Sequence, residues 1–291
     1  MPSPDAATVR SVSRRLWDLI EPIASSVYFV PEAHANYEKL GLAGFGNGYF
    51  CSRGACMGQV PGEVVAATFA VFNPAVVIAA VTDGWAKTDA ASVLQARLDG
   101  QRTALTRMLG ATADPTKLAR ATELMMRAAE AAPVAGRPLF AGLRSLGLPG
   151  DPIGDLWRAA DTLREHRGDS HVLAWTAMHV GAVEATLLTE LWWNQRVGGY
   201  VKTRGWGADD IEAGIASLRQ RGFIDGDPAT FTAAGEELRS VIEEMTDAGE
   251  TEVVAALGDD ADELFDLLAP WTNAVLEAKG YPRDPAAVGR S

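Results

Sequence analysis

The stretch that most constrains the fold is residues 207–247, "GADDIEAGIASLRQRGFIDGDPATFTAAGEELRSVIEEMTD". Ile211, Ile215 and Leu218 have the spacing of one apolar stripe on a helix. The following "FIDGDPATFT" predicts two short strands around a Gly-Asp-Pro turn, and Thr232 is a candidate cap for the next helix. A helix, a short hairpin and a helix, after an earlier helix pair that ends at "RGW", form the order of a winged helix.

The first helix of this stretch carries acidic residues where a DNA reader needs cations. A recognition helix presents its N-terminal turns to base edges and phosphates. Here those turns contain Asp209, Asp210 and Glu212, and the predicted wing adds Asp225 and Asp227. We interpret the three helix carboxylates as partners of the positive end of the helix dipole.

Three cations just before this helix are the candidate DNA contacts: Arg196, Lys202 and Arg204. A strong DNA binder makes roughly six to ten phosphate contacts, so three support only weak binding. The chain also has 38 acidic and 26 basic residues, a net charge of −12, which repels nucleic acid and anionic lipid at long range. DNA is therefore a disfavoured partner, and we expect no membrane partner.

The length and the periodicity predict a mostly α protein of two domains. At 291 residues the chain exceeds the usual domain size of roughly 100–200 residues. Helical periods dominate, and alternating strand patterns are scarce. We predict a helical N-terminal domain over residues 1–132, a connecting loop over 133–152, and a winged-helix domain with terminal helices over 153–285. A monomer and a dimer both stay open.

Short motifs recur in the same order in the two predicted domains. "RLWDLI" is followed by "YEKLGL" in the first, and "DLWRAA" by "LRQRGF" in the second. This order suggests that the N-terminal domain is a degenerate copy of the winged-helix domain. Two such halves would meet at a hydrophobic seam.

Several further segments have predicted conformations. The N-terminal helix is expected to run from about Ala6 to Ile20 and to end before Pro22. A buried helix pair is expected to hinge at Pro74, where "VVAATFAVFNPAVVIAAV" is too interrupted for a membrane span. We predict a long helix from about Ala90 to Leu109, and an irregular loop or short hairpin for "GFGNGYFCSRGACMGQ".

The densest polar cluster, "REHRGDSH", lies between two predicted helices that cover about 153–165 and 172–193. As a charged loop it offers donors, acceptors and groups that titrate near neutrality. One interpretation is a ligand site in which an arginine binds an anion and a histidine transfers a proton. The other is an ionic network that fixes the corner between the helices. The candidate ligand-binding residues are Arg164, His166, Arg167, Asp169 and His171.

A second cluster, "GYFCSRGACMG", contains Arg53 as its single cation. Arg53 either faces a ligand anion, and is then a sixth ligand-binding residue, or pairs with an acid of the other half. The two cysteines, Cys51 and Cys56, lack a metal-ligand spacing and an adjacent base, so we assign no metal site and no catalytic residue. No P-loop, GxGxxG, GxSxG or HExxH motif is present, and we predict no cofactor.

The combination "LRQRGF" and "TAAG" resembles the winged helix of MarR-type regulators. Over nearly the whole chain, "YFVPEAH", "GYFCSRGACMG", "GRPLFAGLRSLGLPGDPIGDLWRAADTLREHRGDSHV" and "IEEMTD" resemble the SalK-like helix-turn-helix family of actinobacteria. The resemblance implies the helix-turn-helix fold. It implies no particular reaction.

The leading functional hypothesis is a cytoplasmic, regulator-like protein that binds a small organic molecule between its halves, with DNA binding weak or lost. We expect a cytoplasmic location because two cysteines are too few for a disulfide framework, and the N-terminal stretch shows no export signal. One alternative is an enzyme or resistance protein of specialised metabolism that uses His166 or His171 as its acid-base residue. The others are a sequence-specific DNA-binding regulator and a module that binds another protein through the acidic helix face.

Overall fold

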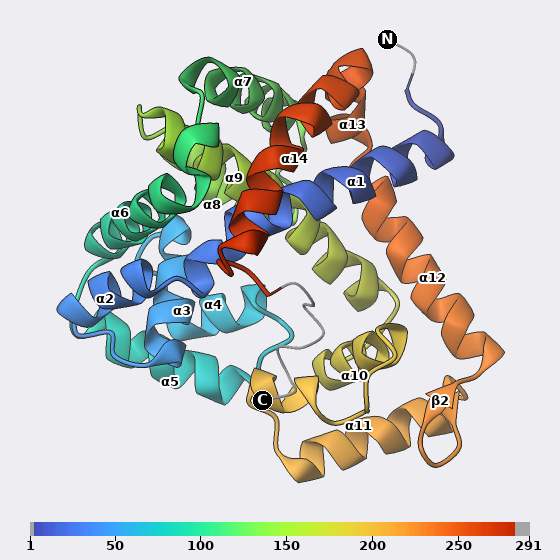
Figure 1. Ribbon diagram of the computed structural model, residues 1–291. Helices are drawn as coiled ribbons and strands as arrows, with labels where there is room; N and C mark the ends of the chain where they lie inside the picture. Colours follow the sequence, from blue (N-terminus) through green and yellow to red (C-terminus); the bar gives the residue numbers. More distant parts are fainter. Residues whose placement is uncertain (1–2, 283–291) are drawn as a thin grey trace.

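The computed structural model describes residues 3–282, and Figure 1 shows that these residues are almost entirely helical. The prediction of a mostly α fold is confirmed. The α-helices are α1 (Ala6–Ser25), α2 (Pro31–Lys39), α3 (Phe45–Gly54), α4 (Gly62–Thr68), α5 (Pro74–Trp85), α6 (Ala90–Leu109), α7 (Pro115–Ala131), α8 (Pro138–Leu146), α9 (Pro152–Ala177), α10 (Ala182–Trp192), α11 (Ala208–Gln220), α12 (Ala233–Ala248), α13 (Thr251–Leu257) and α14 (Ala261–Glu277). A 3-10 helix, η4 (Tyr200–Arg204), precedes α11, and two strands, β1 (Ile224–Asp225) and β2 (Thr230–Phe231), follow it.

The largest core is built around α9 from helices on both sides of the predicted domain boundary. It combines α1, α6 and α7 with α9, α13 and α14. Trp157 of α9 is 1% exposed, and its indole Nε1 donates to the carbonyl of Ala24 in α1 at 3.1 Å. Because this core joins both predicted domains, the boundary at 133–152 does not separate two cores. The domain division and the internal duplication stay predictions, and residues 283–285 lie outside the described residues.

A second core holds the winged helix together. It contains apolar side chains of the C-terminal part of α9, of α10, α11 and α12, and of the wing. Helices α10 and α11 approach so closely that a Cβ atom on Gly214 would lie 2.6 Å from Val183 Cγ1. Strand β1 pairs antiparallel with β2, so that Ile224 lies opposite Phe231. Thr232 caps α12 as predicted, by accepting from the N–H of Gly235 at 3.2 Å.

A third core packs α3, α4, α5 and α8 together. The hinge at Pro74 is confirmed, since α4 and α5 meet there and Asn73 caps α5. The predicted loop or hairpin over "GFGNGYFCSRGACMGQ" is wrong, because residues 45–54 form α3. Burial explains the difference: Phe50 packs on Phe69 and Phe72 at ring-centroid distances of 6.0 and 5.0 Å, and this packing outweighs the poor helix propensity of glycine.

Three other predicted boundaries are corrected. Helix α1 continues through Pro22 to Ser25, because Ile23 and Ala24 are fully buried in the core. The predicted loop over 133–152 contains α8. The predicted charged loop over "REHRGDSH" lies in the middle of α9, which is one helix of 26 residues. Most of its charged side chains can be buried because they form ion pairs or hydrogen bonds with other helices.

None of the helices within residues 3–282 is by itself long and apolar enough to cross a membrane. The only combination there that passes by length and composition is α9 with α10, which is bent by 110° at its break.

We predict that Asp161→Asn strongly destabilises the fold. The Asp161 carboxylate is fully buried and accepts a hydrogen bond from Arg97 Nη1 at 2.7 Å. Burial alone would lower the pKa of Arg97, but the charge of Asp161 keeps that pKa raised. Removal of the carboxylate charge leaves a buried cation uncompensated, which costs about 3–5 kcal/mol. Urea denaturation measures this loss in the free energy of unfolding.

Two controls test the origin of that loss. The double variant Arg97→Met, Asp161→Leu removes both charges and should recover most of the stability. Lys87→Ala breaks an exposed pair with Asp83 and should leave the free energy of unfolding nearly unchanged. A loss below about 1 kcal/mol for Asp161→Asn would show that the pair does not support the core.

Candidate functional site

A cleft of about 500 Å³ lies between the N-terminal helices and the winged helix. Helices α1, α3 and α4 line one side, and α9, α10, η4 and α12 line the other. Eight aromatic side chains and only two carboxylates line it. Its cations are the six arginines Arg14, Arg53, Arg164, Arg167, Arg204 and Arg239.

The continuous helix α9 sorts the predicted ligand residues onto two faces. Arg164, Arg167 and His171 line the cleft, because spacings of three and four residues place side chains on one helix face. Arg53 of α3 lines the cleft from the opposite side. His166 and Asp169 are not among the residues that line it. The structure therefore brings the two sequence clusters together around one cleft. Four of the six predicted ligand-binding residues line it.

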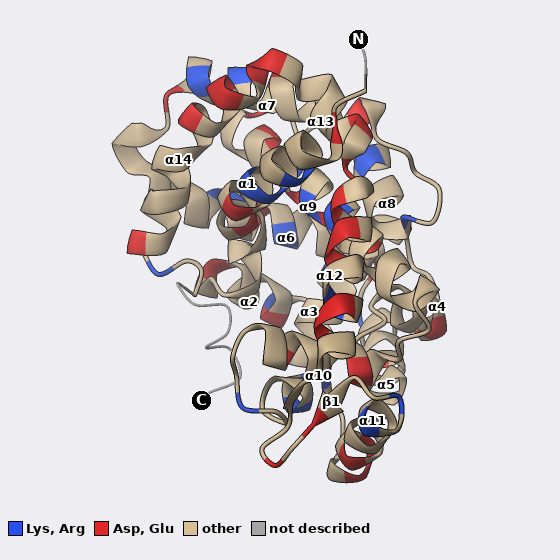
Figure 2. Ribbon diagram, turned by 90° about the vertical axis from the view of Figure 1, so that its right-hand side faces the viewer, with Lys and Arg blue, Asp and Glu red and all other residues tan. Residues whose placement is uncertain are grey.

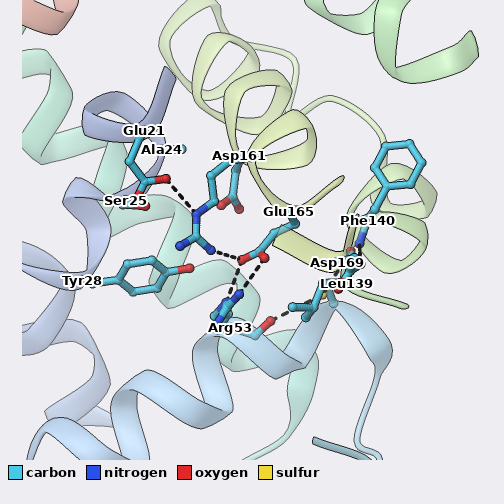
Figure 3. A network of polar contacts seen from close by, with 12 residues as sticks. Glu21, Ala24, Ser25, Tyr28, Arg53, Leu139, Phe140, Asp161, Glu165 and Asp169 are labelled. Carbon is cyan, nitrogen blue, oxygen red and sulfur yellow. Dashed lines mark hydrogen bonds and ion pairs between the residues drawn. The ribbon is translucent and has the colours of Figure 1, made fainter. Parts of the chain in front are cut away.

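Arg53 and Arg164, which line the cleft, share one buried carboxylate (Figure 3). Glu165 accepts from Arg53 Nε and Nη2, both at 2.7 Å, and from Arg164 Nη1 at 2.7 Å. Arg164 Nε also donates to Glu21 of α1 at 3.1 Å. Burial alone would raise the pKa of Glu165, but the charges of Arg164 and Arg53 outweigh it and hold that pKa well below its ordinary value. Arg53 thus pairs with an acid from the other predicted half, which was one of its two sequence interpretations.

Three other arginines of the cleft form ion pairs with acids of α12. Arg14 and Arg167 both bind the Asp247 carboxylate, through Arg14 Nη2 and Arg167 Nη2 at 2.8 Å each. Arg239 pairs with Glu243 within α12. These pairs connect α1 and α9 to the helix that follows the wing.

Arg204 differs from the other arginines of the cleft. It makes no ion pair with any residue in 3–282, whereas each of the other five does. Its guanidinium lies 4.1 Å from the ring centroid of Tyr200 and 4.8 Å from that of Phe72. It also donates to the Tyr200 hydroxyl. The sequence pattern predicts Arg204 only as a candidate DNA contact, not as part of a cleft.

Three buried N–H donors on residues that line the cleft have no acceptor within the described part of the chain. They are Nη1 of Arg167, Nε1 of Trp175 and Nε of Arg204. A buried donor without an acceptor costs about 1–3 kcal/mol. No sequence signal marked these donors, because their lack of partners depends on tertiary packing.

His171 is neutral at physiological pH. Burial lowers its pKa to about 4, and the nearby charges of Arg239 and Arg167 act in the same direction. Its Nδ1 lies 3.0 Å from the Thr246 hydroxyl, which itself donates to the Ile242 carbonyl at 2.7 Å. The hydroxyl oxygen therefore accepts from Nδ1–H, and Nε2 carries the lone pair.

His166 and Asp169 have structural partners outside the cleft. His166 is fully buried, and its Nδ1 lies 2.8 Å from Glu250 Oε1. Asp169 accepts from the N–H of Phe140 at the start of α8 at 3.1 Å, and burial raises its pKa to about 7 (Figure 3). The helix predicted to begin near residue 172 does not begin there, because α9 runs without a break from Pro152 to Ala177.

The two cysteines are free and buried. Burial raises the pKa of Cys51 and of Cys56 to about 12, so neither thiol is ionised at neutral pH. Neither is an activated nucleophile.

Acidic residues lie along α11, the wing and α12 (Figure 2). Asp209 and Glu212 are exposed, and Asp210 accepts from the N–H of Gly207 at 3.1 Å. Gly207 is the N-cap of α11. Of the predicted DNA contacts, Arg196 and Lys202 are exposed, whereas Arg204 lines the cleft.

A groove of about 1090 Å³ runs between α11 and the wing. Three acids line it, Glu212, Asp227 and Glu236, against two cations, Arg196 and Arg219. Arg219 already donates to the carbonyl of Gly226 at 2.8 Å. Acids therefore outnumber cations in this groove, which is unfavourable for contact with phosphates.

Comparison with known proteins places this geometry in a family. No curated protein and no solved structure matches the chain. The model of a helix-turn-helix family matches residues 13–282, which include the cleft and the winged helix. Helix-turn-helix proteins commonly use this unit to bind DNA, so the family indicates a regulator-like protein and makes DNA a partner to test. The chain belongs to this helix-turn-helix family.

Proposed function

We propose that this chain is a regulator-like helix-turn-helix protein that binds a small organic molecule in the cleft and contacts DNA weakly or not at all. The observation that carries the proposal is the cleft itself, which is lined by eight aromatic side chains and by Arg204, a cation without an ion-pair partner among residues 3–282. A ligand with an anionic or acceptor group would pair with this guanidinium. A cytoplasmic location and the finer SalK-like and MarR-type relationship belong to the same proposal.

The apolar lining of the cleft supports an organic ligand. Trp192 and Trp193, which line the cleft, are 41% and 36% exposed. Large exposed apolar side chains inside a concave site are typical of a surface that a ligand covers. The volume is also within the usual range of small-molecule sites, about 300–1,000 Å³.

The position of the cleft connects a ligand to the winged helix. η4 lines the cleft and leads into α11 through three residues, and α12 lines it and follows directly on the wing. A bound molecule would therefore contact segments on both sides of the hairpin. This arrangement suits a protein in which the ligand changes the position of α11.

The enzyme alternative receives less support. His166 is fully buried away from the cleft, so a substrate there could not reach it. His171 lines the cleft, but its low pKa of about 4 makes it a weak base near neutrality. We assign no catalytic residue.

Filling the cleft should abolish ligand binding. The probes are 2-naphthoate and its neutral amide, 2-naphthamide, and we expect at least one of them to raise the melting temperature of the protein. A ligand present at ten times its Kd stabilises the native state by about 1.4 kcal/mol. Gly168 lines the cleft, and a Cβ atom there would make only an ordinary contact, 3.4 Å from Glu165 Oε2. Gly168→Leu should remove the thermal shift and keep the fold.

The matched control is Gly46→Leu. Gly46 is also in a helix, its added Cβ would meet nothing within 4 Å, and it does not line the cleft. This variant should retain the thermal shift. No shift with either compound, or an equal shift in Gly168→Leu, would contradict the proposed site.

The acidic face of α11 predicts weak DNA binding. Fluorescence anisotropy of a labelled mixed-sequence duplex at about 50 mM salt should show no saturable binding up to tens of micromolar protein. The double variant Asp209→Lys, Glu212→Lys should bind the same duplex measurably, because it reverses two exposed charges. Saturable, salt-sensitive binding by the unmodified protein would instead support a sequence-specific DNA-binding regulator.

A further inference from the structure

We infer that the ligand of the cleft is an aromatic monocarboxylate whose carboxylate binds Arg204. This inference rests on the proposed function, because it names the chemical class of the molecule that the cleft would hold. Three independent features of the cleft support it: its charge balance, the environment of Arg204 and the distribution of its aromatic rings.

The charge balance of the cleft leaves one positive charge. Its six arginines are matched by five carboxylates that line it or pair with these arginines: Asp18, Glu21, Glu165, Glu243 and Asp247. His171 adds no charge, because its imidazole is neutral. A monoanion balances the remaining charge, whereas a phosphate monoester, with a charge of about −1.5 to −2 at pH 7, exceeds it.

Arg204 is the cation that remains without a carboxylate. Its Nε is buried and has no acceptor within residues 3–282, and its planar group lies against the rings of Phe72 and Tyr200. Contacts with two rings restrict the guanidinium to few orientations. A preorganised guanidinium binds a carboxylate through two parallel N–H···O bonds with little loss of side-chain entropy.

The other arginines of the cleft are already held by carboxylates. Arg167 is bound by Asp247 through Nη2, and Arg239 pairs with Glu243. Arg204 is therefore the arginine of the cleft that a ligand carboxylate can bind without displacing an ion pair.

Aromatic rings near Arg204 favour a flat apolar body for the ligand. Tyr200 contacts Arg204 and also packs edge-on against Trp193, with ring centroids 5.3 Å apart. Trp193 and its neighbour Trp192 expose apolar surface at the cleft. An aromatic ligand anchored at Arg204 could therefore cover the exposed faces of these indoles.

The test compares 2-naphthoate with 2-naphthamide by isothermal titration calorimetry on the full chain. The two probes have nearly the same shape and differ in charge. We expect 2-naphthoate to bind roughly tenfold or more tightly, as for other hydrogen bonds to charged groups. Arg204→Gln should weaken 2-naphthoate by a similar factor and leave 2-naphthamide within about twofold.

Two further variants complete the design. Arg196→Gln removes an equivalent charge from the same segment, at an exposed position outside the cleft, and should bind 2-naphthoate as the unmodified protein does. Arg204→Lys keeps the charge but loses the bidentate geometry. Its affinity for 2-naphthoate should therefore fall between those of the unmodified protein and of Arg204→Gln. Because this substitution is conservative, it also serves if thermal melting shows that Arg204→Gln does not fold.

The outcomes separate the two proposals. Equal affinities for the two probes, or no loss with Arg204→Gln and Arg204→Lys, would overturn the carboxylate assignment and leave the ligand site standing. Failure of both probes to bind would contradict the proposed function together with this inference.

Discussion

The pairing of buried acids on α9 with arginines from distant helices is the constraint on which the rest of the structure depends. Asp161 binds Arg97 of α6, and one turn later Glu165 binds Arg53 of α3 and Arg164. Buried carboxylates demand such partners, since ionised groups are otherwise too costly to remove from water. These pairs therefore fix α3 and α6 against α9, and with them one wall of the cleft.

The dependence of α9 on distant partners explains what could be predicted from the sequence. The winged helix was predictable because its signals are local: the stripe on α11, the turn of the wing and the Thr232 cap lie within some 40 residues. The eight residues from Arg164 to His171 were expected to form a loop because their charges suggested solvent. Arg53 and Glu165 are separated by 112 positions, and no local pattern reveals that they meet.

The same reasoning applies to the candidate site. The arginines and histidines of α9 could be recognised from composition, but the division into a cleft face and a structural face requires the helical phase. His166 and Asp169 were indistinguishable from Arg167 and His171 while the segment was read as a loop. Arg204 was recognised as a cation, but its position against Phe72 comes from contact between η4 and the turn between α4 and α5, 132 residues earlier.

The charged residues of the winged helix are divided between its exposed surface and the cleft. Exposed residues of α11 and the wing include acids and the cation Arg219, whereas η4 and α12 place Arg204 and Arg239 at the cleft. A protein selected for contact with DNA would place its cations outside, where phosphates can reach them. Here Arg204, which has no ion-pair partner among residues 3–282, lies against the aromatic rings of the cleft. The position of this cation therefore favours a small anion over a duplex as its partner.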